Sequence, residues 1–531
     1  MKLRKKEVLW SLILLFPVCL MYGYYFYNTP NNATASGFIQ SDMYSYLANA
    51  RQFMDNDNTS IFYSNPFDSD TNAPKIYSQP QILILAFCIK VLHLSPSLSF
   101  LIFGFLFGWL FMLACVLLYQ QFFDLKGYKH IIGLIIFVYG GGLLIFSGSL
   151  WYLLYDSSSL SAVFRYDPGE GWWMLNFGRN LIYPLESYYH FLVLLSFILF
   201  FKNKHLGVCL TLFILSWSHP FYGIEFLIVF AAIYSIEFGY SIIKKEKQKR
   251  TYYPLIIILA LLTIHIYYYL MFLPSFESHQ SLMSQWKIDW SHGVVSLSMA
   301  YIFGLLLTGI NIYNYGGFSK FFSVFNHRVL TIWFFICLLF VNHNLLITPI
   351  QPLHFDKGYV LAPLWLMGLP VLFNWFKILG QKYSKSILIL ASIPMIFIIL
   401  SDNIAWFAGA RADSNGYIYS DERVIFDTLE KTYTKNDLLI SNDDELPYKA
   451  TVYCSINTYI SHGYNTPYWE DKKKICDKIF SSSKVPAELS CINEGKLVLV
   501  INTLKKTLDY SKISKKLIYK NTTYQIFEIA K

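Results

Sequence analysis

The chain has 531 residues, of which 55% are hydrophobic and only 15% are charged. Soluble globular proteins carry about 25% charged residues, so this composition excludes an ordinary soluble domain and indicates a polytopic membrane protein. The formal net charge is +9, but the basic residues form short clusters between apolar segments. Such clusters are typical of cytoplasmic loops, and no nucleic-acid partner is expected.

Apolar segments long enough to span a membrane, which takes about 20 residues, recur about eleven times along the chain. In chain order, the predicted spans are residues 7–27, 98–121, 129–152, 187–202, 205–218, 222–243, 253–273, 294–314, 328–348, 358–378 and 386–407. The basic start MKLRKK predicts a cytoplasmic N-terminus, and all later basic clusters then fall on the cytoplasmic side. The expected fold is therefore a polytopic α-helical membrane protein with an extracytoplasmic C-terminus.

One further apolar run, residues 81–94, is predicted to be an interfacial helix in a long first extracytoplasmic loop, residues 28–97. The run is short and contains Lys90 and His93. If it were a span, every later basic cluster would move to the outside. The outer loops are the longer ones and hold most of the clustered acidic, aromatic and histidine residues. We therefore expect any chemistry on the extracytoplasmic side.

The composition changes near residue 408, which predicts a transmembrane domain over 1–407 and a small soluble α/β domain over 408–531. Turn-separated β-like runs lie at 437–441, 496–502 and 523–529, with helical patterns at 421–433 and 471–480. Three cysteines lie in this tail, namely Cys454, Cys476 and Cys491. If the tail is extracytoplasmic, one pair could form a disulfide, and the sequence leaves open whether any pair does.

The segment SDMYSYLANARQF, residues 41–53, follows the first span and opens with a carboxylate, Asp42. Apolar residues then recur every three or four positions, which predicts an amphipathic helix at the membrane surface with Ser41 as its cap. In the first turn, the helix dipole favours an ionised Asp42, which could act as a general base or bind a metal. Tyr46 is a candidate substrate contact beside it. The alternative is that Asp42 only starts a helix.

The segment QPLHFDKGY, residues 351–359, lies between two spans and places His354, Asp356 and Lys357 beside the membrane. A cation in this position could hold a lipid phosphate as a point charge. The alternative is a lysine that extends its charge to the membrane surface from an otherwise ordinary loop.

The turn WSHPFYGIE, residues 217–225, supplies two further candidates for substrate binding, His219 and Glu225. A carboxylate inside a span is costly to bury and is therefore a functional hypothesis by default. The alternative is that Glu225 pairs with a neighbouring helix. His265 and His343 also lie in spans, and we expect both to be hydrogen-bonded core residues.

The loop from Arg165 to Glu186 combines tryptophans with charged residues, including Asp167, Glu170 and Arg179. Such a mixture suits a sugar or a lipid headgroup. The alternative is an interfacial loop that is anchored in the membrane by its tryptophans.

Taken together, these segments resemble a membrane-integral glycosyltransferase of the GT-C superfamily, in particular a bacterial branch without an assigned substrate. The resemblance covers nearly the whole chain and is architectural. It rests on Asp42 in a long first outer loop with YSNPF (63–67), the SHPF turn (218–221), QPLHFDKGY and the soluble tail.

The resemblance implies a sugar donor carried on a polyprenyl phosphate, and an envelope glycan, lipid or protein as acceptor. It implies that Asp42 is catalytic, as a base or as the ligand of a divalent metal such as Mg or Mn, and that Lys357, His354 and Arg179 lie near the donor phosphate. It further implies the bacterial inner (cytoplasmic) membrane, with the active site on the extracytoplasmic side.

Two departures from the family pattern narrow the choice of relatives. Met43, and not a second acid, follows Asp42, and the tail has no WWD triplet. The alternative functions to a glycosyltransferase of this superfamily are an envelope polysaccharide polymerase or ligase and, ranked below it, a membrane transporter.

Overall fold

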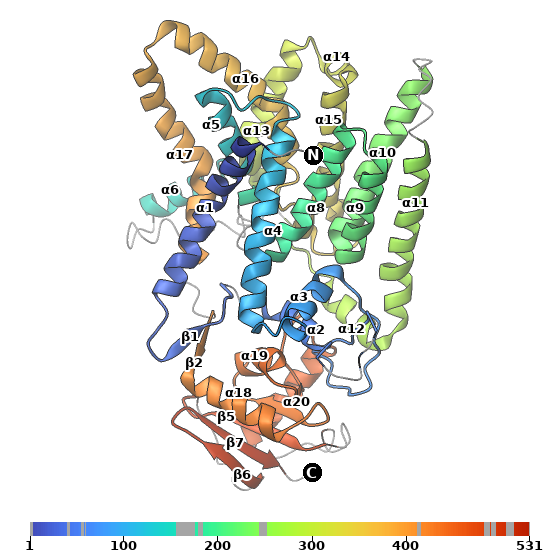
Figure 1. Ribbon diagram of the computed structural model, residues 1–531, viewed down its shortest axis with the longest axis vertical. Coiled ribbons are helices and arrows are strands. Elements are labelled where there is room, and N and C mark those ends of the chain that lie inside the picture. The colour runs from blue at the N-terminus through green and yellow to red at the C-terminus, as the bar shows by residue number, and fades with distance from the viewer. Residues whose placement is uncertain are drawn as a thin grey trace. The chain divides into compact units, whose positions relative to one another are not determined.

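The computed structural model describes residues 4–39, 43–54, 58, 60–155, 176–178, 184–243, 252–291, 293–410, 416–482, 489, 495–505 and 514–529 (Figure 1). The chain is mostly helical and divides into two compact units. Unit 1 consists of Met1–Gly23, Phe103–Tyr267 and Lys287–Ala412. Unit 2 consists of Tyr24–Ile102, Tyr268–Trp286 and Asp413–Lys531.

Seven helices of the described chain are long and apolar enough to cross a membrane. They are Lys5–Tyr27 (α1), Pro96–Tyr119 (α4), Pro220–Ile243 (α10), Tyr252–Ser275 (which begins with α11, Tyr252–Tyr267), Val294–Asn314 (α13), Leu361–Lys382 (α16) and Ser386–Ile404 within α17 (Lys385–Ala410). Each corresponds to one of the predicted spans, so the chain is an integral membrane protein.

Three more predicted spans are shorter apolar helices, α8 (Pro184–Phe201), α9 (His205–Ser218) and α15 (Phe325–Val341). Helices α8 to α11 lie side by side in Figure 1, and α9 packs against all three of the others. The shorter elements of unit 1 are α14 (Phe318–Ser323), η6 (His343–Leu345) and η7 (Pro352–Phe355). A total of about eleven spans is not confirmed, because these three helices are short for a crossing and the remaining predicted span, residues 129–152, is not one helix.

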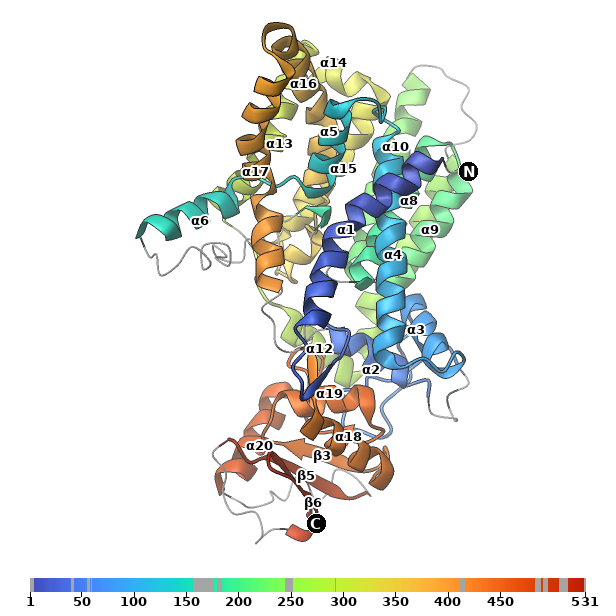
Figure 2. The same cartoon turned by 60° about the vertical axis from the view of Figure 1, so that its left-hand side comes forward.

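The prediction of one span over 129–152 is wrong. The segment forms two helices, α5 (Tyr128–Tyr139) and α6 (Leu144–Tyr155), and Figure 2 shows them running in different directions. The break is a run of glycines pressed against neighbouring elements. A Cβ atom on Gly141 would lie 2.1 Å from Oδ2 of Asp402, and one on Gly142 would lie 2.1 Å from the carbonyl oxygen of Ala300. Only glycine fits there, and glycine also weakens a helix by about 1 kcal/mol relative to alanine.

In unit 2, the tail forms a five-stranded sheet in the order β4-β3-β5-β7-β6. Its strands are β3 (Leu438–Ser441), β4 (Asn457–Thr458), β5 (Leu497–Asn502), β6 (Ser514–Lys520) and β7 (Tyr524–Ile529), and its helices are α18 (Ser420–Thr432), α19 (Glu445–Tyr453) and α20 (Trp469–Ser482). Strand β3 is parallel to β4 and β5, whereas β7 is antiparallel to β5 and β6. The three predicted strands and two predicted helices are confirmed, while β4, β6 and α19 were not predicted.

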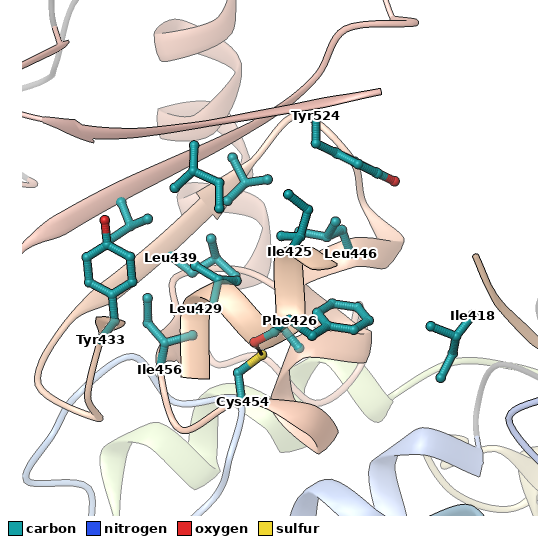
Figure 3. Close-up of a cluster of buried hydrophobic side chains, with 14 residues drawn as sticks. Ile418, Ile425, Phe426, Leu429, Tyr433, Leu439, Leu446, Cys454, Ile456 and Tyr524 are labelled. Carbon is teal, nitrogen blue, oxygen red and sulfur yellow. Dashed lines mark hydrogen bonds between the residues drawn. The ribbon is translucent and has the colours of Figure 1, made fainter. Parts of the chain in front are cut away.

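The two faces of this sheet bury separate apolar cores, because successive side chains of a strand point to opposite faces. Figure 3 shows the first core, which contains Leu439 and Cys454, and the second contains Leu438 and Cys476. Both cysteines are free. A disulfide between Cys454 and Cys476 is therefore excluded, and Cys491 lies outside the described residues.

The first loop contributes the remaining elements of unit 2. Strand β1 (Ala33–Ala35) pairs antiparallel with β2 (Tyr417–Tyr419). The predicted amphipathic helix is α2 (Tyr44–Arg51), which begins with Met43 in the N-cap position, later than the sequence pattern suggested. Its apolar face is buried by packing against α3 (Pro80–Lys90) and α19. The prediction of an amphipathic helix is therefore confirmed. Part of its apolar face, which was expected to lie at a membrane surface, packs against protein.

Helix α3 is the segment that was predicted to lie at the membrane surface. It has 11 residues, which at 1.5 Å per residue gives about 16 Å, too short for a bilayer core of about 30 Å. It buries Ile82 and Leu85 but exposes Ile84 and 53% of Phe87. An apolar side chain on each face suits a helix that lies between protein and lipid. The elements η4 (Tyr268–Phe272), η5 (Leu273–Ser275) and α12 (Glu277–Trp286) complete unit 2.

Candidate functional site

A group of polar side chains, most of them buried, gathers in unit 1 at one end of its helices, where α9 ends and α8, α10 and α16 begin. We call it the polar cluster. Its members are Glu186, His190, His219, Glu225, Tyr301, Asp356, Lys357 and Tyr359. The segments 217–225 and 351–359, which the sequence marked separately, meet here.

The turn between α9 and α10 is set by its proline. A residue before proline is restricted to extended backbone, and His219 has φ −151° and ψ 129°. Pro220 then starts α10, where its missing N–H has no intrahelical acceptor to lose. His265 fixes the turn, since Nδ1 lies 2.9 Å from Oγ of Ser216 and Nε2 lies 2.9 Å from the carbonyl oxygen of Pro220. The expectation of a hydrogen-bonded core histidine at position 265 is confirmed.

The loop before α16 has an unusual backbone. Gln351 and Lys357 adopt positive φ angles of 46° and 39°, and Gly358 has φ 92°. A Cβ atom on Gly358 would lie 3.0 Å from the backbone nitrogen of Phe177, so the two chain segments touch through their backbones. A left-handed conformation costs a non-glycine residue on the order of 1–3 kcal/mol, and such residues concentrate at functional sites.

The loop presents Lys357 to Glu186 in the first turn of α8. Nζ lies 2.5 Å from Oε1, and the side chains are only 2% and 13% exposed. The N-terminal end of a helix is a favourable position for an acidic side chain. Its other oxygen, Oε2, has no hydrogen-bond partner among the described residues. The pair therefore retains an acceptor position that a ligand could use.

Two further hydrogen bonds tie the loop to neighbouring helices. Nδ1 of His190, one turn after Glu186, lies 2.5 Å from the hydroxyl oxygen of Tyr359. The hydroxyl of Tyr301 in α13 donates to Oδ2 of Asp356 at 2.6 Å. All four side chains are buried. These contacts fix Asp356 and Tyr359 on either side of Lys357.

Glu225, in the second turn of α10, is fully buried. Neither of its carboxyl oxygens accepts from an N–H or O–H group within the described part of the chain, and the thiol of Cys337 is the weak donor that faces it. Its ionisable neighbours are the thiol of Cys337 and the carboxyl of Asp356. Burying a polar group without partners costs about 1–3 kcal/mol by mutational measures, so this arrangement is not favoured by stability alone.

The rim of the cluster is partly exposed and aromatic. The rings of Phe221 and His354 stack with centroids 5.1 Å apart and 6° between their planes. The ring of His219 stacks on Tyr222 at 4.2 Å. Burial among these rings, together with the charge of Lys357, lowers the pKa of His219 to about 3. His219 is therefore neutral at physiological pH and can accept a hydrogen bond.

The structure brings four of the sequence candidates together, namely His219, Glu225, His354 and Lys357. Tyr46 belongs to unit 2, where it is partly exposed on α2. The remaining candidates lie outside the described residues, namely Asp42, Asp167, Glu170 and Arg179.

Sequence reasoning missed three features of the cluster. The ion pair between Glu186 and Lys357 joins residues 171 positions apart, which no local pattern reveals. His190 lies four residues after Glu186 at the start of an apolar helix, and that helical spacing could have drawn attention to it. Tyr301 is one of 41 tyrosines and carries no local signal.

The donor set for a divalent metal is incomplete in what the structure describes. Within the described ranges, no group of three or more His, Cys, Asp or Glu side chains is arranged to hold a metal ion. The described residues alone therefore supply no Mg or Mn centre, and the metal stays a prediction attached to Asp42.

Comparison with known proteins gives little beyond this geometry. No model of a protein family matches the chain, and no curated protein matches it either. Among solved structures, ArnT from Cupriavidus metallidurans in the apo state aligns over 97% of each chain, with a TM-score of 0.46 and 10% identity. Similarity at this level carries no argument about activity, which has to come from the sequence and the site.

Proposed function

We propose that the chain is a membrane glycosyltransferase of the GT-C type that takes a sugar from a polyprenyl-phosphate donor. The observation that carries the proposal is the polar cluster. An ion pair, two further carboxyl groups and two histidines gather at one end of otherwise apolar helices. That is where the headgroup of a lipid carrier would be presented, and where burial strengthens electrostatic interactions.

In this proposal, Lys357 meets the donor phosphate. When the bond between the anomeric carbon and the phosphate oxygen breaks, polyprenyl phosphate leaves with a negative charge that a cation stabilises. Lys357 is already paired, so the phosphate would compete with Glu186 for its ammonium group. Arg179 is proposed as a second cation, from the sequence alone. The partly exposed Phe221 and His354 at the rim would contact the sugar or the carrier.

The acceptor hydroxyl attacks the anomeric carbon and must lose its proton. Asp42 is proposed as the base from its place in the first loop, and neutral His219 is proposed to accept a hydrogen bond that orients the hydroxyl. The proposed acceptor is an envelope glycan, lipid or protein. The charge pattern of the loops supports the extracytoplasmic side of the inner membrane.

A transfer assay tests the proposal. The purified protein, reconstituted in proteoliposomes, is given defined polyprenyl-phosphate sugars, and release of polyprenyl phosphate is measured with and without acceptor fractions from the envelope. We expect Asp42→Asn to abolish release, and Asp427→Asn, an exposed acid on α18, to leave it unchanged. Full activity of a correctly folded Asp42→Asn variant would remove Asp42 from the mechanism. Absence of release with every donor would reject the proposal.

A proton-coupled transporter is the second candidate, because Glu225 is a buried carboxyl within a span. Buried carboxyl groups in spans often relay protons. The same proteoliposomes distinguish the two functions. Proton-driven uptake of a solute that Glu225→Gln abolishes, without any donor cleavage, would favour transport. We expect donor cleavage and no uptake.

A further inference from the structure

Unit 2 contains a polar pocket of about 110 Å³ that no part of the proposed mechanism uses. One wall is the first loop from Arg51 to Lys75, and the other is formed by Lys435 and the segment after α19. At about 10–15 Å³ for each water position, the pocket has room for roughly eight waters, which is the scale of one sugar residue. None of its lining residues belongs to the polar cluster.

The walls of this pocket are held together by specific contacts. Nη2 of Arg51 donates to Oε1 of Glu430 at 2.8 Å and to Oγ of Ser455 at 3.0 Å. Nδ2 of Asn65 donates to the carbonyl oxygen of Asn465 at 2.9 Å. These bonds join residues about 400 positions apart in the sequence. The pocket is therefore built by the fold and is not a gap between two loose loops.

The lining has a definite chemistry. It contains three cations, Arg51, Lys75 and Lys435, against two acids, Asp68 and Asp70, and most other lining residues are amides and hydroxyls. None of the described residues that line it is aromatic, whereas sites for apolar small molecules are lined mainly by apolar and aromatic groups. Lys75 is exposed and has no ion-pair partner among the described residues. Arg51 is paired with Glu430, and Asp68 faces Lys472. The remaining lining charges are Lys75 and Lys435 against Asp70, and this excess of one cation at a polar surface favours an anion that also carries hydroxyls.

We propose that this pocket binds an anionic saccharide, with its carboxylate or phosphate on Lys75 and its hydroxyls on the amide and hydroxyl side chains around it. Amides and hydroxyls both donate and accept, so they match sugar hydroxyls in either role. The assignment of this saccharide as the acceptor rests on the proposed function. Binding itself requires no catalysis and can be measured separately.

Three sugars that share one ring and differ at carbon 6 test the proposal: glucose, glucuronic acid and glucose 6-phosphate. Binding to the full chain in lipid nanodiscs is measured by saturation-transfer NMR. We expect at least one of the two anions to bind about tenfold more tightly than glucose, a difference of about 1.4 kcal/mol, and to weaken as salt is added. Comparison of the two anions shows whether the carboxylate or the phosphate is preferred.

The matched variants are Lys75→Ala and Lys520→Ala, both of exposed lysines in unit 2. We expect Lys75→Ala to reduce the preference for the anion about fivefold or more, and Lys520→Ala to leave it unchanged. Equal binding of all three sugars, no signal from any of them, or an undiminished preference in Lys75→Ala would overturn the proposal.

A binding measurement on a variant of the polar cluster distinguishes failure of the pocket proposal from failure of the proposed transferase function. The Lys357→Met variant should bind the anionic sugar as the unmodified chain does, even where transfer is lost. If no donor is ever cleaved but the preference for the anion persists, the transferase proposal fails and the pocket stands. If transfer occurs but Lys75→Ala leaves the acceptor KM unchanged, the pocket is not the acceptor site.

Discussion

Two buried ion pairs in unit 1 have the same charges and different surroundings. Glu237, near the far end of α10, pairs with Arg328 through two contacts, Nε to Oε1 at 2.6 Å and Nη2 to Oε2 at 2.9 Å. Nη1 of Arg328 donates to the carbonyl oxygens of Phe322 and Ser323, and the guanidinium lies 4.1 Å from the ring centre of Tyr240. Every charged group of this pair is satisfied by protein.

The pair between Lys357 and Glu186 is less complete. Oε2 of Glu186 has no hydrogen-bond partner among the described residues, and the backbone of Lys357 is strained. Glu225 lies in the same cluster, 12 residues before Glu237 on α10, which is about 18 Å along the helix axis. An ion pair whose hydrogen-bonding groups are all satisfied by protein contributes to the stability of the fold. An ion pair in a strained loop, with a carboxylate oxygen that has no described partner, is available to bind a ligand.

The largest expected effect is on the closed pair. Arg328→Met should lower the free energy of unfolding by about 3–5 kcal/mol, because it leaves Glu237 buried without its partner. The double variant with Glu237→Gln should recover part of this loss. Thermal unfolding in detergent measures both. The rate of sugar transfer per folded molecule of Arg328→Met should not change. If Arg328→Met lost transfer without losing stability, the Arg328–Glu237 pair could not be called structural in contrast to the Lys357–Glu186 pair.

Lys357→Met is expected to act on transfer. Loss of a charge that stabilises the leaving phosphate should slow cleavage of the donor by about 10²–10³-fold. The loss of unfolding free energy should be smaller than for Arg328→Met, because Glu186 lies in the first turn of α8, where the helix dipole favours a carboxylate. Initial rates in proteoliposomes, divided by the folded fraction, test this. If Lys357→Met cleaved the donor at the rate of the unmodified chain, the Lys357–Glu186 pair would also be structural.

Glu225→Gln and Asp356→Asn sharpen the comparison within the cluster. Glu225 faces only the weak thiol donor of Cys337 in the described chain, and a neutral amide costs less to bury than a carboxylate, so Gln should increase the free energy of unfolding by about 1 kcal/mol. Asp356 accepts a hydrogen bond from Tyr301, so Asn should decrease it by about 1–2 kcal/mol. Thermal melts of the two variants should therefore move in opposite directions. A lower melting temperature for Glu225→Gln would show that the carboxyl is stabilising.

The smallest effect is expected from His219, and only in acid. Its folded pKa of about 3 lies below its unfolded value near 6.5, so the unfolded chain binds the extra proton in that window. This contribution to stability is complete above pH about 6.5 and is lost as the pH falls towards about 3. His219→Phe should flatten the decline over that range. Because the His219 ring is partly exposed, we expect its effect on the free energy of unfolding to be smaller than the full pKa shift implies. If the dependence of stability on pH were the same in His219→Phe, His219 would be more solvated than its burial indicates.

Much of the architecture was determined by the sequence alone. The spans follow from the length of apolar runs, and the tail strands follow from short runs of Leu, Ile and Val between turns. Pro220 alone dictates the extended backbone of His219. The sequence also marked four members of the candidate site, because charged groups beside apolar spans are costly enough to attract attention wherever they occur.

Only the tertiary structure decided how these parts are used. The glycine run that splits 129–152 is a break because Asp402 and Ala300 press against it, and both lie more than 150 residues further along the chain. The partner of Lys357 is Glu186, 171 residues away, and the partner of Asp356 is Tyr301, 55 residues away. Local sequence records the intrinsic preference of each residue for water, helix or strand. Which charge meets which depends on helix packing, and that contact is encoded in no single segment.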